Sequence, residues 1–415
     1  MNYSEKIQCK CGKLHKCEIK HIVIKKNALE NSKNLFKRYK NILLIADKNT
    51  FSAYGKKLHL FKSLNCKIYI FNTNNVLVPN EKAIKTIENH LEKSTDLIVG
   101  VGSGVINDLC KYISFKNDLP YFIIASAPSM DGYASSGAAL IINNMKITYP
   151  AHVPTAIIAD TDVLRQSPID MIKSGIGDII GKYSALNDWR LSNLINDEFF
   201  CENIFQNIGK NIKEVEKNID KIIDRNEQSV QLLMESLVKV GIAMSYAENS
   251  RPASGSEHHI AHYFEITGIL NKQQYLPHGI DVLYGTYLTS KIRKEILKTK
   301  TPAKPIDREK WKKEIKSAYG RISNGIIELQ ENAGWINLNF NEIYQQKWIN
   351  IQQILEEAPS PKEIEKVMQK LELSTNFFEK FYGKKRINDA IKYAKFLKER
   401  FTVLWLINQK NVLNS

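Results

Sequence analysis

The sequence lacks any apolar run close to the roughly 20 residues that a membrane-crossing helix needs. Its first ten residues, MNYSEKIQCK, contain no apolar segment of the kind found in secretory signals. Cysteine is scarce, with 6 among 415 residues, which excludes a disulfide scaffold and fits thiols in a reducing compartment. We therefore expect a cytoplasmic protein without a membrane span.

Acidic residues are fewer than basic ones, and the formal net charge is +15. Clustered Lys and Arg would indicate nucleic-acid binding. Here the lysines are dispersed along polar helix faces, without one stripe of cations and interleaved aromatic residues, so we expect no nucleic-acid partner. Two interpretations remain, a solvated basic surface or a positive potential that draws in small phosphorylated anions.

The order of apolar patterns predicts two domains. Up to residue 160, short Ile- and Val-rich runs alternate with helix-length segments, which is typical of a parallel, doubly wound α/β sheet. The predicted strands are 21–24, 41–47, 67–71, 96–101, 120–126 and 155–160, with helices over 27–37, 51–64 and 80–92 and a β-hairpin over 138–149 that turns at Asn143 and Asn144. Later helices are predicted over 170–191, 228–249, 255–269, 308–330 and 387–406. We place the boundary near residue 165, with an α/β domain over 1–165 and an all-α domain over 166–415.

A glycine-rich turn follows the predicted strand at 96–101 and contains Gly100, Gly102 and Gly104. Glycine lets the backbone approach a ligand closely, and a helix that starts here would direct its free N–H groups at a phosphate. The turn departs from the G-x-G-x-x-G fingerprint, because Asn107 stands where the third glycine should be. A purely structural tight turn is the alternative.

Asp47 ends the predicted strand at 41–47. An acid at this place in a nucleotide-binding sheet often contacts a ribose hydroxyl, which would disfavour the 2′-phosphate of NADP. Asp47 could equally cap the helix that starts near Thr50.

The segment CKCGKLHKCEIKH interleaves Cys9, Cys11 and Cys17 with His15 and His21. These residue types could form a zinc-binding loop. However, C-x-C with these intervals is not a common structural zinc spacing, and the sequence assigns the segment no role.

The helical half carries metal-ligand residue types in three stretches, SGIGDIIGKYSALNDW, RPASGSEHHIAHYFE and LPHGIDVLYGTYL. Asp178 follows two glycines at what we expect to be the start of a helix. His258 and His262 are four residues apart and so share one helix face, with His259 turned away. His278 follows Pro277 and precedes Gly279, in what we expect to be an exposed turn that opens the next helix. One carboxylate and two imidazoles suit Zn²⁺, Ni²⁺ or Fe²⁺, although each His taken singly also fits a structural or surface residue.

Five stretches together resemble the glycerol-1-phosphate dehydrogenase family, within the superfamily of iron-containing alcohol dehydrogenases, glycerol dehydrogenase and dehydroquinate synthase. They are GVGSGVIND, APSMDGYASSGA, SGIGDIIGKYSALNDW, SGSEHHIAHYFE and LPHGIDVLYGT. The resemblance covers most of residues 20–290 in order, whereas the last hundred residues match loosely and CKCGKLHKC lies outside the superfamily core. It implies a dinucleotide-binding α/β domain, an all-α metal-binding domain and a cofactor cleft between them.

The resemblance also implies roles for individual residues. Asp178, His258 and His278 would hold one divalent metal, zinc or nickel. Asp131, Asp178 and His262 would be catalytic and bind the substrate, and His262 is the candidate proton donor. The residues implied for NAD or NADP are Asp47, Gly102, Gly104, Val105, Ile106, Asn107, Asp108, Ser126, Ala127, Pro128, Ser129 and Ser135. For the substrate phosphate we predict Lys182 and Arg251, because each is near a ligand segment in the sequence; either could instead be a surface cation.

The implied reaction is the reduction of dihydroxyacetone phosphate to sn-glycerol 1-phosphate, and its reverse, in phospholipid or glycerophosphate metabolism. We expect a small phosphorylated substrate and a homodimer. The alternatives are a dehydrogenase of glycerol or another polyol and a non-catalytic protein that binds NAD or metal. Dehydroquinate synthase is disfavoured, because the additional basic residues expected for a carboxylated sugar phosphate are not found.

Overall fold

The computed structural model describes residues 6–72, 77–143 and 145–407. Contacts divide the chain into two compact units, the first comprising Met1–Ile179 and Lys213–Asn249, the second Ile180–Ile212 and Ser250–Ser415. Helices α7 (Ile169–Asn196) and α8 (Glu202–Lys217) each contribute residues to both units. This division differs from a single boundary near residue 165, because α10 (Glu227–Ala247) and the start of α7 group with the sheet.

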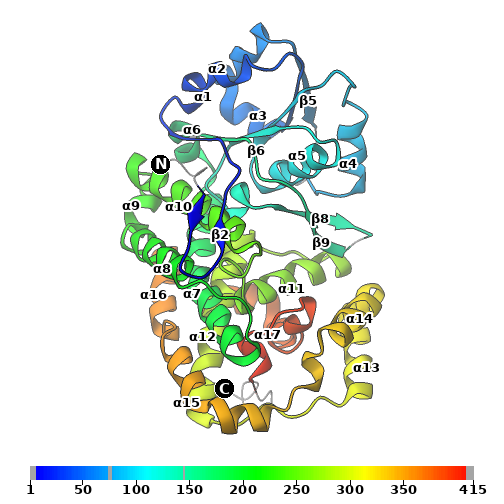
Figure 1. Ribbon diagram of the computed structural model, residues 1–415, viewed down its shortest axis with the longest axis vertical. Coiled ribbons are helices and arrows are strands. Elements are labelled where there is room, and N and C mark those ends of the chain that lie inside the picture. The colour runs from blue at the N-terminus through cyan, green and yellow to red at the C-terminus, as the bar shows by residue number, and fades with distance from the viewer. Residues whose placement is uncertain (1–5, 73–76, 144, 408–415) are drawn as a thin grey trace. The chain divides into compact units, whose positions relative to one another are not determined.

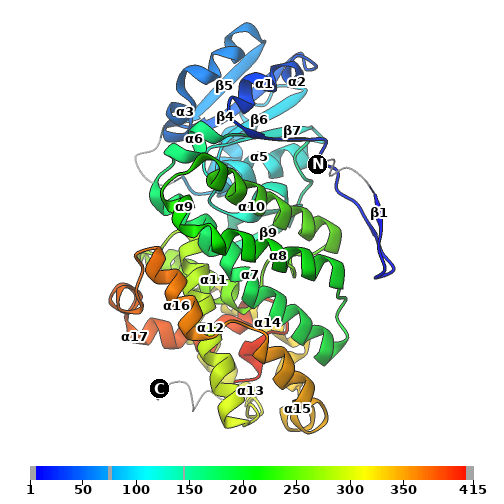
Figure 2. The same cartoon turned by 90° about the vertical axis from the view of Figure 1, so that its left-hand side faces the viewer.

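The described part of the first unit contains a six-stranded sheet with the strand order β3-β10-β7-β6-β4-β5. Its strands are β3 (His21–Lys25), β4 (Ile42–Asp47), β5 (Cys66–Phe71), β6 (Leu97–Gly102), β7 (Tyr121–Ala125) and β10 (Ala156–Asp160). Every neighbouring pair is parallel. The predicted doubly wound α/β class is confirmed, and the buried strands read as continuous apolar runs because helices cover both sheet faces (Figure 2).

The helical elements of this unit are α1 (Ala28–Asn31), α2 (Lys33–Phe36), α3 (Lys48–Tyr54), η1 (Gly55–Ser63), α4 (Glu81–Glu88), α5 (Gly104–Lys116), η2 (Asp131–Ala134), α6 (Thr161–Gln166), α9 (Ile219–Ile223) and α10. The helix predicted over 51–64 is divided, because Gly55 adopts a positive φ of 47° and the chain continues as the 3₁₀ helix η1. Two antiparallel hairpins accompany them: β1 (Ile7–Gln8) with β2 (Leu14–His15), and β8 (Gly137–Ile142) with β9 (Met145–Pro150) (Figure 1). The predicted second hairpin is confirmed; Asn143 has the positive φ of 51° that its turn requires, and Asn144 lies outside the described residues.

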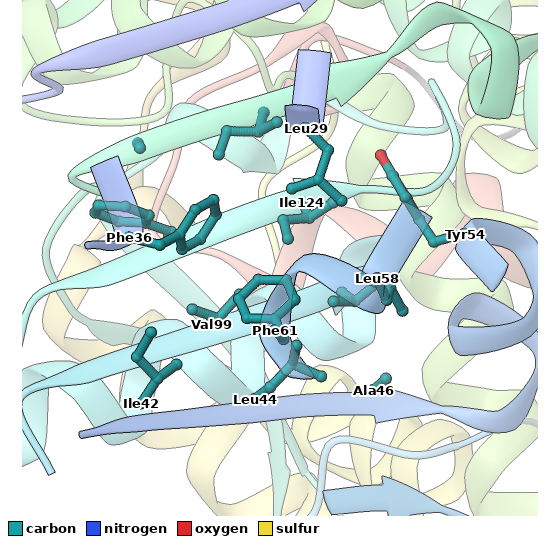
Figure 3. Packing of buried hydrophobic residues seen from close by; sticks show 14 of the residues in the cluster. Leu29, Phe36, Ile42, Leu44, Ala46, Tyr54, Leu58, Phe61, Val99 and Ile124 are labelled. Carbon is teal, nitrogen blue, oxygen red and sulfur yellow. The ribbon is translucent and has the colours of Figure 1, made fainter. Parts of the chain in front are cut away.

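One hydrophobic cluster holds α1, α2 and η1 on one face of the sheet (Figure 3). Alternate residues of β4, Ile42, Leu44 and Ala46, point into it, as the period of a strand requires. The Phe36 ring meets the Phe61 ring edge to face, with ring centroids 5.0 Å apart. This packing fixes the strands and therefore the loops that leave their carboxyl ends.

The second unit is helical. Besides its parts of α7 and α8 it contains α11 (Ser256–Asn271), α12 (His278–Thr299), α13 (Arg308–Tyr319), η3 (Gly320–Ile322), α14 (Ser323–Ala333), η4 (Trp335–Asn337), α15 (Phe340–Glu356), α16 (Pro361–Lys370), α17 (Thr375–Tyr393), η5 (Ala394–Leu397) and η6 (Val403–Trp405). The helix predicted over 308–330 breaks at Gly320, where φ is 52°.

The helix predicted over 387–406 is wrong beyond α17. Lys398 is extended, and the segment buries Phe401 and Trp405 completely. The carbonyls of Lys398 and Phe401 accept hydrogen bonds from Gln330 and Arg251. Tertiary contacts therefore replace the intrahelical bonds that the apolar spacing predicted.

Helix α10 is long and apolar enough to cross a membrane by length and composition. Within its apolar window, 67% of the helix is buried inside the structure. It packs against η2 and α6 of the same unit. These contacts are typical of a core helix in a globular domain.

Candidate active site

The topology of the sheet marks one place for a ligand. Strands β4 and β6 are neighbours, but the chain continues from β4 to β5 on one side and from β6 to β7 on the other. In open α/β sheets, ligands bind outside the carboxyl ends of strands at such a switch point. Asp47 ends β4 and Gly102 ends β6. The Thr50 hydroxyl donates a 2.8 Å hydrogen bond to the Val101 carbonyl and so ties the two ends together.

Asp47 caps α3. Its Oδ1 accepts hydrogen bonds from the backbone N–H groups of Asn49 at 2.8 Å and Thr50 at 2.9 Å, and Thr50 completes a capping box. The capping interpretation is confirmed. Because both bonds use one oxygen, a ribose contact through the same carboxylate is chemically compatible with capping and stays a prediction.

The glycine turn between β6 and α5 has a packing requirement of its own. A Cβ on Gly102 would lie 2.6 Å from the Cβ of Ile106, and a Cβ on Gly100 would lie 3.0 Å from the Sγ of Cys110. These two glycines let α5 lie directly on β6, whether or not a ligand binds. Gly104 meets only ordinary contacts and opens the 13-residue helix α5, whose first N–H groups suit an anion. The phosphate cradle therefore stays a prediction that rests on the start of α5.

The loop after β7 carries four of the predicted cofactor residues, 126–129, and is held from two directions. The Ser126 N–H donates to the Gly102 carbonyl at 3.0 Å. On the other side α7 approaches so closely that a Cβ on Gly175 would lie 1.9 Å from the Pro128 carbonyl oxygen. The loop is therefore fixed beside the glycine turn.

Lys111 was not predicted as part of the site. It is fully buried in α5, and its Nζ donates to the carbonyls of Gly132 at 2.8 Å and Gly137 at 2.9 Å and to the Ser135 hydroxyl at 3.1 Å. Desolvation lowers the pKa of Lys111, while Asp108 at 3.7 Å opposes this effect. Burial raises the pKa of Asp108 to about 6. A lysine among the apolar residues of a core helix was the sequence signal for this role.

Asp131 and Asp178 meet within the first unit. Asp131 opens η2, and its N–H donates a 2.9 Å hydrogen bond to the Oδ2 of Asp178. Asp178 is fully buried. The prediction that Asp178 starts a helix is wrong, because α7 begins at Ile169 and runs through Gly175, whose missing side chain makes room for the loop after β7.

Three imidazoles come together in the second unit. His258 and His262 lie on α11, and His278 is the first residue of α12. The ring centroids are 5.1 Å apart for His258 and His278, 5.6 Å for His262 and His278, and 5.9 Å for His258 and His262. Neighbouring His259 is fully buried, and desolvation holds its pKa well below the usual range.

Glu257 is a second residue that the sequence did not single out. Its Oε1 lies 2.7 Å from the Nδ1 of His258 and accepts the Gly255 N–H at 2.8 Å. A carboxylate on one ring nitrogen orients a His for metal binding through the other. Burial raises the pKa of Glu257, and the charge of Lys182 opposes this shift. Lys182 is itself fully buried, so it is not a surface cation.

Arg251 has a structural role. Its Nε donates to Glu198 at 2.7 Å, its Nη1 to the Phe401 carbonyl at 2.8 Å and its Nη2 to the Ser192 hydroxyl at 2.9 Å. The side chain is almost completely buried. The prediction that Arg251 binds the substrate phosphate stays a prediction, and the bonds from its three guanidinium nitrogens show that the side chain also holds parts of the second unit together.

Comparisons with known proteins show which family and fold this chain resembles. The sequence model of the iron-containing alcohol dehydrogenase family matches residues 23–168. The NAD(P)+ glycerol-1-phosphate dehydrogenase of Halalkalibacterium halodurans is 32% identical, over 69% of this chain and 74% of that protein. The enzyme of the same name from Geobacillus thermodenitrificans is 28% identical, over 97% of this chain and 95% of that protein. An archaeal halo-thermophilic alcohol dehydrogenase from a Red Sea brine pool shares the fold, with a TM-score of 0.66, 12% identity and coverage of 96% and 97%.

Proposed function

The chain belongs to the glycerol-1-phosphate dehydrogenase family, and from that premise we propose that it interconverts dihydroxyacetone phosphate and sn-glycerol 1-phosphate with NAD or NADP. The observation that carries the proposal is the cluster of His258, His262 and His278, with the Glu257 carboxylate on His258. The switch point between β4 and β6 supports the part of the proposal that concerns the binding of NAD or NADP.

We assign the divalent metal, zinc or nickel, to Asp178, His258 and His278, which are residue types that can hold such an ion. The donors fit, because both ions accept carboxylate and imidazole ligands. Glu257 supports this assignment, since its contact with Nδ1 leaves Nε2 of His258 for the metal. When bound, a divalent metal supplies Lewis-acid polarisation of the substrate carbonyl.

The chain's own residues position the ketone and supply its proton. When bound, the reduced nicotinamide would supply the hydride for C2, and the C2 oxygen then needs a proton. His262 delivers that proton from its ring, one helical turn from His258. Asp131 accepts a hydrogen bond from a substrate hydroxyl, and its backbone is held by Asp178, which also meets the substrate.

The residues proposed to hold the cofactor lie at the start of α5 and in the loop after β7. Residues 104–108, residues 126–129 and Ser135 would bind NAD or NADP, and the first N–H groups of α5 suit its phosphates. Lys111 supports this arrangement by fixing Ser135 and η2. Lys182 and Arg251 are the proposed partners for the substrate phosphate. We also propose that the protein is cytoplasmic, as its six thiols suggest, and that it is a homodimer.

Replacing His258 tests the metal assignment. His258→Ala should lose bound metal and dehydrogenase activity together, because it removes a ligand and the imidazole that Glu257 orients. His59→Ala is the matched control, since His59 is exposed and lies on η1. Metal content by mass spectrometry and nicotinamide absorbance are measured on the same preparations. Full activity with full metal content in His258→Ala would refute the assignment.

A further inference from the structure

The N-terminal hairpin carries metal-ligand side chains that the proposed reaction does not use. Strands β1 and β2 pair with Ile7 opposite His15, and Cys9 and Cys11 lie in the turn between them (Figure 1). The Cys9 N–H donates to the Lys13 carbonyl at 3.1 Å, and the chain reverses at Gly12, where φ is +85°. The turn therefore folds the C-x-C pair back toward the strand that carries His15.

This fold supplies the geometry that the spacing alone did not predict. The Sγ of Cys11 lies 3.3 Å from the Nε2 of His15, and the ligand atoms of Cys9, Cys11 and His15 lie within 4.8 Å of one another. A tetrahedral zinc ion with ordinary bond lengths separates a sulfur and a nitrogen ligand by about 3.6 Å. The three atoms are therefore spaced as ligands of one ion.

The other nitrogen of His15 gives independent support. Its Nδ1 lies 2.8 Å from the Tyr246 carbonyl, which accepts hydrogen bonds only, so Nδ1 carries the proton. The ring also stacks on Tyr246, with centroids 5.5 Å apart, and His15 is 2% exposed. The lone pair of Nε2 therefore faces Cys11, and a backbone carbonyl behind the ring is the usual support of a zinc-binding His.

We propose that the hairpin binds a structural zinc ion through the Sγ atoms of Cys9 and Cys11 and the Nε2 of His15. Closed structural zinc sites take four ligands, so a further thiolate is expected. The candidates are Cys17 and Cys201, which are both buried. Zinc takes the thiolate form, so binding releases a proton from each thiol.

The zinc ion would stabilise the first unit. The hairpin rests on the end of α10 through His15 and through a 3.1 Å ion pair between Lys13 and Glu248. Earlier in the same helix, α10 lies against η2 so closely that a Cβ on Gly241 would be 2.8 Å from the Asp131 carbonyl oxygen. Zinc at the hairpin thus stabilises the helix that supports a predicted substrate residue, without contacting the substrate.

Cobalt substitution in the full-length protein tests the proposal. Thiolate ligands give Co²⁺ a charge-transfer absorption in the near ultraviolet, whereas the carboxylate and imidazoles proposed for the active site do not. The absorption should be present in the wild type, lost in Cys11→Ser and Cys9→Ser, and retained in Cys66→Ser, a thiol on β5. The absorption should also be retained in His278→Ala, which alters the proposed active-site metal site and leaves the hairpin intact. An error in the active-site assignment would therefore not be mistaken for an error in the hairpin proposal. Loss in Cys17→Ser or Cys201→Ser identifies the fourth ligand.

Absence of the absorption in the wild type, or an unchanged spectrum in Cys11→Ser, would overturn the proposal. A second measurement does not depend on the folding of any variant. Titrating the zinc-loaded wild type with a mercurial thiol reagent, with a zinc-sensitive dye present, should release one zinc ion per chain as thiols react. Thiol modification without zinc release would equally overturn it.

Discussion

Gly175→Ala perturbs the contact between α7 and the loop that carries four predicted cofactor residues. The added Cβ would lie 1.9 Å from the Pro128 carbonyl oxygen and 2.9 Å from its carbon. Real Cβ atoms essentially never approach a heavy atom within 3.0 Å, so the carbonyl must move by about 1 Å. The Ser129 carbonyl, which accepts a 3.0 Å hydrogen bond from the Ser174 hydroxyl, must move with it.

Two opposing effects determine how much Gly175→Ala changes the free energy of unfolding. Alanine in a helix interior is favoured over glycine by about 0.5–1 kcal/mol. Overpacking typically costs about 1–3 kcal/mol, and the upper part applies because the clash is with backbone that no rotamer change relieves. We expect a net loss of about 1–2 kcal/mol in the free energy of unfolding. A displacement of about 1 Å should also weaken NADH binding or turnover by about tenfold to a hundredfold.

Urea unfolding followed by circular dichroism measures the first effect, and NADH fluorescence titration measures the second. Gly209→Ala is the matched control, because Gly209 lies within α8 and nothing within 4 Å would meet its Cβ. The control should gain about 0.5–1 kcal/mol and bind NADH normally. A Gly175→Ala protein that is as stable as the wild type and binds NADH equally well would refute the reasoning.

Three further predictions concern charged residues. Asp47→Asn should keep the cap of α3, with stability within about 0.5 kcal/mol, while raising the affinity for NADPH relative to NADH; an unchanged cofactor ratio would exclude the ribose contact. Arg251→Ala should cost about 2–4 kcal/mol in urea unfolding because it removes the cation from Glu198 and the donor from the Phe401 carbonyl, whereas a large rise in the KM of dihydroxyacetone phosphate without loss of stability would support the phosphate role. Burial raises the pKa of Asp108 from 3.8 to about 6, so the stability from its protonated form is present below pH 3.8 and lost as pH rises to about 6. Asp108→Asn should reduce this loss in the free energy of unfolding by about 1–3 kcal/mol. If urea unfolding of the variant had the same pH dependence as that of the wild type, the raised pKa of Asp108 would be contradicted.

The sheet was predictable because its strands are buried on both faces. Runs such as ILLIAD and LIVGVG contain so few polar residues that a parallel sheet is the simplest structure that can bury them. The predicted ends of the six sheet strands lie within about one residue of the observed ends. The positive φ of Gly55 and Gly320, by contrast, depends on local geometry, so the helices that break there were predicted as continuous.

Residues of the candidate site were predictable where their residue type allows few roles. Hydrogen bonds between residues that are distant in the sequence were not predictable. The clustering of His258, His262 and His278 follows from one helix face and the start of the next helix. Nothing near Arg251 in the sequence indicates Phe401, which accepts its Nη1 bond. Likewise, the buried Lys111 contacts Gly132 and Gly137 because η2 and the start of β8 both pack against α5.

The most direct test of the proposed function is the oxidation of NADH or NADPH by the metal-reconstituted protein with dihydroxyacetone phosphate or with dihydroxyacetone. We predict that nicotinamide absorbance falls only with the phosphorylated ketone and that the product is sn-glycerol 1-phosphate, identified by a stereospecific assay. Turnover of the unphosphorylated ketone alone would make the protein a polyol dehydrogenase. Silence with both ketones in a metal-loaded, folded preparation would contradict the proposed activity.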